Sequence, residues 1–146
     1  MFNIPLDYPS YAEEIAVVKA TTSGKSVQLN HIVTAEQILE FQQLVRKIPI
    51  ADNVLEYAVS LTTKTRPNTP KATTVVNNYI SWGAGPRASQ YLVLGAKCHA
   101  AINGKYSPDI EDVRAIAKYV LRHRIVPNYK AEAEGMTADK IIESLF

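Results

Sequence analysis

The sequence predicts a mainly α-helical fold, a single bundle of about six helices preceded by a short strand stub at the N-terminus. Apolar residues recur at helical spacing in six segments, and helix start and stop signals bound most of them. No segment alternates regularly enough to predict a sheet. These observations together favour a helix bundle.

Each expected helix has its own boundary signals. Ser10 with Glu13, and Thr34 with Gln37, have the spacing of capping boxes. The first helix covers about residues 10–22, and Pro49 limits the second, which starts near residue 34. The other four start near Asp52, Pro86, Ser107 and Thr137 and end near Pro67, Asn103, Pro127 and Phe146.

The apolar positions of each pattern predict the faces that turn inward. They are Tyr11, Ile15 and Val18; Ile38, Phe41, Val45 and Ile48; Val54, Ala58 and Leu61; Tyr91, Leu94, Gly95, Cys98 and Ile102; Ile110, Val113, Ala117, Val120 and Leu121; and Ile141, Ile142 and Leu145. The helix that contains Tyr91 also has small residues that would permit close packing, namely Gly95, Ala96, Ala100 and Ala101. Residues 64–82 read mainly as a loop, and residues 75–80 fit either a short strand or one helical turn.

Length and composition are those of an ordinary globular domain. The chain has 146 residues, 47% hydrophobic and 21% charged, with a net charge of +2. A single cysteine, Cys98, excludes an internal disulfide framework and suits a reducing compartment. With no apolar run near the roughly 18–20 residues that cross a bilayer, we expect a cytoplasmic protein.

Several chemical signals are weak. Gly24-Lys25-Ser26 ends like a phosphate-binding loop, but Lys19 stands where the first glycine belongs, and a helix precedes it. Cys98 and His99 have no second pair at metal-ligand spacing, so no metal site is expected. Arg114, Lys118 and Arg122 share one helix face, which is either a solvated surface or a contact with a partner or nucleotide.

The strongest signal lies at residues 83–87. Gly83 and Gly85 give the loop conformational freedom and allow a ligand to approach the backbone. Pro86 favours a helix start, and Arg87 projects from its first turn. An arginine is a directed bidentate donor for phosphate oxygens. The same string also fits a simple helix-start loop with an exposed arginine.

The string Gly-Ala-Gly-Pro-Arg-Ala-Ser at residues 83–89 resembles the sensor 2 motif of MoxR-family AAA+ ATPases. Asp-Tyr-Pro-Ser at 7–10, the helix at 33–48 and the segments at 106–113 and 121–125 are similar to other parts of that family's lid. The family often has serine where this chain has Gly85. The resemblance covers nearly the whole chain, and the sensor 2 string and late-helix pattern are its specific parts.

The resemblance implies that residues 1–9 are a linker or stub from a missing AAA+ core and that residues 10–146 form a helical C-terminal lid. Arg87, with Gly83 and Gly85, would then contact ATP, which is held with Mg²⁺ by the core of the same or a neighbouring subunit. The intact protein would be an ATPase that forms a ring, commonly a hexamer, and acts like a chaperone on a client protein.

The isolated fragment is expected to bind no cofactor and to hydrolyse no ATP, since the phosphate-binding loop and magnesium-binding acids of the family lie in the core. No nucleic acid or membrane partner is expected. A free-standing helical interaction module without nucleotide chemistry is the alternative. A phosphate-binding loop roughly 150–200 residues upstream, about one domain away, would decide between them.

Overall fold

The computed structural model describes residues 1–24 and 28–146 and confirms the mainly helical fold. Its helices are α1 (Tyr11–Thr22), α2 (Ala35–Lys47), α3 (Asp52–Lys64), α4 (Thr74–Tyr79), α5 (Pro86–Ile102), α6 (Ile110–Leu121), α7 (Tyr129–Ala133) and α8 (Ala138–Glu143). Two short strands, β1 (Ile80–Trp82) and β2 (Val126–Pro127), complete the described part of the chain.

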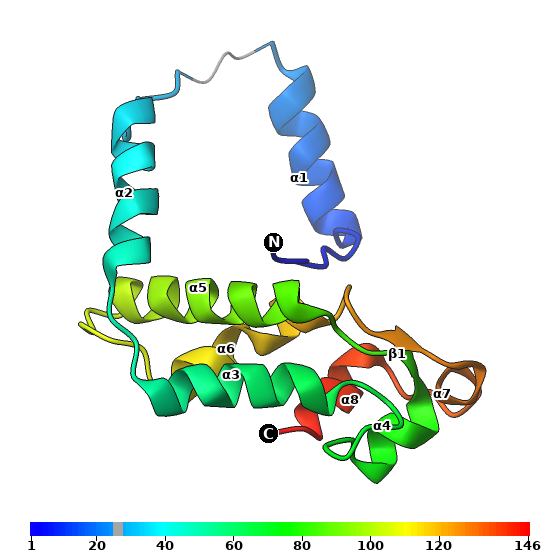
Figure 1. Cartoon of the computed structure of the whole chain (residues 1–146). Coiled ribbons are helices and arrows are strands. Elements are labelled where there is room, and N and C mark those ends of the chain that lie inside the picture. The colour runs from blue at the N-terminus through cyan, green and yellow to red at the C-terminus, as the bar shows by residue number, and fades with distance from the viewer. Residues whose placement is uncertain (25–27) are drawn as a thin grey trace.

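The body of the molecule is built on α3, α5 and α6, with α8 packed against α6 (Figure 1). The expected inward residues of α3 and α8 are buried, as are those of α6 except the half-buried Ile110. α5 and α6 pack closely because the buried face of α5 is made mostly of small side chains. These buried residues of α5 are Ala88, Leu92, Gly95, Ala96 and Ala100.

The buried face of α5 differs from the expected one. Tyr91, Leu94 and Cys98 are only half-buried, and Ile102 is 80% exposed. Gly95, Ala96 and Ala100 are buried, which agrees with the close packing that the small residues of this helix predicted. The large apolar residues were expected on the same face, but the helix turns its small residues toward α6 instead, because only small residues permit such close contact. The prediction of a packed Cys98 on the inner face is therefore wrong.

Two short helices and a small sheet form one end of the body. Residues 75–80, which fitted either a strand or a helical turn, belong mostly to α4, and Ile80 begins β1. β1 pairs antiparallel with β2, where Ile80 lies opposite Pro127. The Thr73 hydroxyl caps α4 and the Asn128 side chain caps α7, so both short helices have local start signals.

α1 and α2 stand away from the body on the same side (Figure 1). Both expected capping boxes are present, with Ser10 paired to Glu13 and Thr34 to Gln37. No residue of either helix is buried, and Tyr11 is 82% exposed. The last turn of α2 lies near α5, where Lys97 Nζ donates to Arg46 O at 3.4 Å. The apolar faces expected to turn inward on these two helices are thus mostly uncovered.

The N-terminal segment lies on α5 and α6 and forms no strand. Asn3 N–H donates to Tyr119 O at 2.8 Å, and this single contact with a helix carbonyl builds no ladder. The Phe2 ring lies 6.2 Å from that of Tyr119 and covers Gly95, whose added Cβ would be 3.1 Å from Phe2 Cζ. The expected strand stub is therefore an irregular segment fixed to the body.

Among the helices that the structure describes, none is long and apolar enough to span a membrane.

Candidate nucleotide-contact site

The loop at residues 83–85 leads from β1 directly into α5. Gly85 is the N-cap in an extended conformation, and Pro86 occupies the first turn, where a missing N–H costs nothing. Ala88 N–H donates to Gly85 O at 2.9 Å and its side chain is fully buried, which fixes the first turn against the core. The direction of the side chain at residue 87 is thereby set.

Gly83 and Gly85 have different structural roles. A Cβ on Gly83 would lie 2.4 Å from Thr65 O and 2.6 Å from Arg66 Cα, so the loop touches the backbone after α3 where only glycine fits. A Cβ on Gly85 would meet nothing within 4 Å. Gly83 therefore has a packing reason to be glycine, whereas Gly85 leaves the approach to the helix start open.

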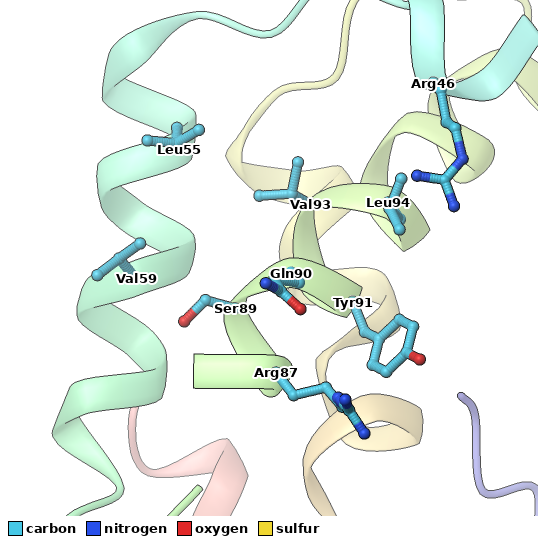
Figure 2. Close-up of a pocket in the computed structure, with 9 residues that line it drawn as sticks. All are labelled: Arg46, Leu55, Val59, Arg87, Ser89, Gln90, Tyr91, Val93 and Leu94. Atoms are coloured by element: carbon cyan, nitrogen blue, oxygen red, sulfur yellow. The ribbon is translucent and has the colours of Figure 1, made fainter. Parts of the chain in front are cut away.

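Arg87 is exposed and lies on a cavity of about 740 Å³ between α2, α3 and α5 (Figure 2). Within the described residues, its guanidinium has neither a hydrogen-bond acceptor nor an ion-pair partner. The first-turn N–H groups of α5 already place partial positive charge here, where a cation is electrostatically unfavourable. Arg87 and the helix start therefore both favour an anion.

The rest of the cavity combines apolar and basic side chains. Its lining also includes Arg46, Leu55, Val59, Ser89, Gln90, Tyr91, Val93 and Leu94, and no acidic residue belongs to this described set. Tyr91 lies one turn after Arg87, and the Arg124 guanidinium is 5.1 Å from its ring centroid, a cation–π contact. No sequence pattern indicated this contact, because Arg124 is remote from Tyr91 along the chain.

His99 has a structural partner. Its Nδ1 lies 2.7 Å from Oδ1 of Asp112, which is fully buried and also accepts from Lys105 Nζ. Asp112 Oδ2 accepts from Asp109 N–H at 2.8 Å, completing the capping box of α6. His99 thus belongs to the network that starts α6. In the described ranges, no group of three or more His, Cys, Asp or Glu side chains has a geometry suited to a metal ion.

The basic row on α6 is paired within the chain. Arg114 contacts Glu111 and the Tyr57 hydroxyl. Lys118 pairs with Glu143, and Arg122 donates twice to Asp139. Because all three side chains already have partners within the chain, the structure favours the solvated surface over a contact with a partner or nucleotide.

The Gly24-Lys25-Ser26 string is only partly described. Gly24 follows α1 with a φ of 66°, the left-handed conformation common after a helix end. Lys25 and Ser26 lie outside the described residues.

The fold and the site define a small helical domain with an arginine at the start of one helix that has no partner among the residues the structure describes. The family model of the AAA lid domain matches residues 72–145, just over half of the chain. The chain therefore belongs to the AAA lid domain family, and this match includes Arg87 and the helices from α4 to α8.

Individual relatives agree with the expected MoxR type. The chain is 26% identical over 142 residues to Chaperone MoxR1 of Mycobacterium tuberculosis, covering 97% of this chain and 37% of that protein. It is 24% identical to the uncharacterized protein YeaC of Bacillus subtilis, covering 99% of this chain and 43% of YeaC. One of these two relatives is named as a MoxR chaperone, which is consistent with the MoxR type that the resemblance implied.

A solved crystal structure of a "putative ATPase" from Cytophaga hutchinsonii matches with a TM-score of 0.86 and 31% identity. The match covers 99% of this chain and 44% of that protein. The chain therefore spans less than half the length of each of these relatives.

Proposed function

We propose that this chain is the lid of a MoxR-type AAA+ ATPase and that Arg87 is its sensor 2 arginine. In this role Arg87 contacts the γ-phosphate of ATP bound to a separate core domain. The observation that carries the proposal is an exposed guanidinium, unpaired within the described residues, at the start of α5. Its place in the string at residues 83–89, inside the matched region, supports the sensor role.

The chemistry of Arg87 fits a transferring phosphoryl group. Its planar guanidinium can donate two parallel hydrogen bonds to phosphate oxygens and keeps its charge at any physiological pH. Such a donor stabilises negative charge that develops in phosphoryl transfer. Gly85 lies two residues earlier with open space around it and lets the phosphates approach the helix start.

The donor set of the described residues fits the phosphate and not the magnesium ion. Mg²⁺ prefers carboxylate and water oxygens, and no group of candidate acidic ligands gathers there. We therefore assign Mg²⁺ to the acids of the core domain, with this chain supplying only the arginine.

The core domain is also the partner that we propose for the uncovered faces of α1 and α2. Ile15 and Val18 on α1, and Ile38 and Phe41 on α2, are exposed apolar side chains at helical spacing. Exposed apolar side chains gathered on one helix face commonly mark a binding site. The named relatives are more than twice as long as the matched segment, which leaves room for such a core.

The lid then links the state of the nucleotide to movement. Contact between Arg87 and the γ-phosphate exists only before hydrolysis, so the preferred position of α5 differs between the ATP and ADP states. In a ring of subunits, commonly a hexamer, this difference moves one subunit against the next and acts on a client protein. Similarity to Chaperone MoxR1 supports the chaperone-like role. A cytoplasmic location stays a prediction.

The test is Arg87→Ala in the full-length ATPase that we propose contains this chain. We expect ATP turnover to fall about 100- to 1,000-fold, the usual cost of removing one donor aimed at developing charge. The fold should change little, because Arg87 is exposed. Arg87→Lys should restore only part of the activity. Lys71→Ala, which removes another exposed cation, is the matched control and should keep full turnover.

Full turnover in Arg87→Ala would refute the sensor role. A loss of turnover accompanied by unfolding, seen by circular dichroism, would show instead that Arg87 supports the fold.

A further inference from the structure

The loop before Arg87 is held by two consecutive residues after α3. Ala84 N–H donates to Thr65 Oγ1 at 2.9 Å, and Arg66 Nε donates to Ala84 O at 2.9 Å. Both backbone groups of Ala84 are therefore bound to the same short segment. Ala84 and Thr65 are almost completely buried, so water does not compete for the hydrogen bond between them.

The Thr65 hydroxyl has a fixed orientation. It donates to Thr62 O at 2.6 Å, which leaves its lone pairs to accept from Ala84 N–H. A hydroxyl held by both a donor and an acceptor cannot rotate without losing one hydrogen bond. The backbone carbonyl of Thr65 also lies against Gly83, where no side chain fits. The segment at residues 65–66 thus holds two consecutive residues of the loop.

These contacts lie very close to Arg87 along the chain. Ala84 is followed by the N-cap Gly85 and by Pro86, whose ring restricts the backbone. Little freedom therefore separates the held residue from Arg87. A shift of Ala84 moves the first turn of α5 and, with it, the guanidinium.

We infer that Thr65 and Arg66 are positioning residues that fix Arg87 for its contact with the γ-phosphate. This inference rests on the sensor role proposed above and adds the residues that set its geometry. Catalytic groups act within narrow limits, and a misplacement of about 1 Å can cost on the order of 100-fold in rate. Neither residue contacts the nucleotide in this arrangement, and both act through the backbone of Ala84.

Steady-state ATPase assays on the full-length protein test this with matched variants. Thr65→Val keeps the shape of the side chain and removes the hydroxyl, and we expect turnover to fall by about 10-fold or more. Thr65→Ser keeps the hydroxyl and should stay within about twofold of the parent protein. Thr63→Val is the control and should leave turnover unchanged, because among the described residues the Thr63 hydroxyl bonds only to carbonyls of α3 itself.

A double-mutant cycle separates positioning from general damage. In an Arg87→Ala background, Thr65→Val should cause no further loss of turnover, because there is no guanidinium left to misplace. If Thr65→Val does not fold, Arg66→Gln removes the second contact at a half-buried position and is analysed in the same cycle.

The outcomes distinguish the two proposals. A drop for Arg87→Ala, with normal turnover for folded Thr65→Val and Arg66→Gln, would overturn the positioning role and leave the sensor role intact. An equal loss with and without Arg87 would also overturn it. Normal turnover in Arg87→Ala would refute the sensor role and the positioning inference together.

Discussion

Substituting Gly83 and Gly85 separately by alanine tests the packing of the Arg87 loop, since each change adds the same methyl group and the two positions are only two residues apart. In Gly83→Ala the new Cβ would lie 2.4 Å from Thr65 O, 2.6 Å from Arg66 Cα and 2.7 Å from Thr65 C. All three are backbone atoms, so no flexible side chain can move aside. The loop or the end of α3 must shift instead.

The expected cost follows from that overlap. Overpacking a well-packed site usually costs about 1–3 kcal/mol, and a backbone-to-backbone clash places Gly83→Ala near the upper end. For a chain of this size, a loss of about 2–3 kcal/mol lowers Tm by about 4–12 °C. Gly85→Ala meets no atom within 4 Å and keeps an ordinary φ of −81°. Alanine is a poorer N-cap than glycine and costs about 0.5–1 kcal/mol of stability, but it also lowers the entropy of the unfolded chain, which offsets this loss.

Thermal unfolding of the purified chain, followed by circular dichroism, measures both variants. We expect Gly83→Ala to unfold well below the parent chain and Gly85→Ala to unfold within a few degrees of it. Equal Tm values for the two variants would refute the close contact between the loop and residues 65–66. The reverse order would show that Gly85, and not Gly83, is the sterically restricted position.

Two further predictions concern charge and nucleotide. A hydrogen bond from Lys105, together with the backbone N–H of Asp112, lowers the pKa of Asp109 from 3.8 to about 2. A pKa lowered in the folded state means that the ionised Asp109 carboxylate stabilises the fold above pH 3.8, and this stabilisation is lost as the pH falls toward 2. The Tm of the parent chain should therefore fall more between pH 4 and pH 2 than that of Asp109→Asn, and parallel curves would contradict this. Calorimetry on the isolated chain should show no ATP binding at micromolar affinity, because one arginine cannot replace the nucleotide site of the core. Binding at that affinity would contradict this and would make Gly24-Lys25-Ser26 a candidate nucleotide site.

The helix starts are the part of the fold that the sequence predicts best. Ser10 with Glu13 and Thr34 with Gln37 interact over three residues, so their pattern determines their contact almost regardless of the rest of the chain. The buried faces of α3, α6 and α8 follow from the same local periodicity. α7 was not expected as a helix, and at α4 a helical turn and a short strand both fitted, because five and six residues are too few to show a helical period.

The face of α5 and the support of Arg87 depend on contacts that local patterns do not contain. The small size of Gly95 and Ala96 indicated close packing, and both are buried. The apolar period also placed the more hydrophobic Ile102 on the inner face, and in the structure Ile102 is exposed. The Thr65 hydroxyl accepts a hydrogen bond from Ala84, which lies 19 residues later in the sequence, and the sequence predicts mainly a loop between them. Local chemistry therefore identified Arg87, but only the folded chain shows what holds it.

The placement of Phe2 on Gly95 changes where the folding unit begins. The expected boundary at residue 10 assumed that the first nine residues only connect two parts of a protein. Phe2 instead fills a notch that a side chain at position 95 would occupy, and Asn3 satisfies a carbonyl of α6. A fragment that started at Ser10 would expose this notch and the Tyr119 ring to water. Residues 1–3 are in that sense part of the body, although α1, which follows them, is not.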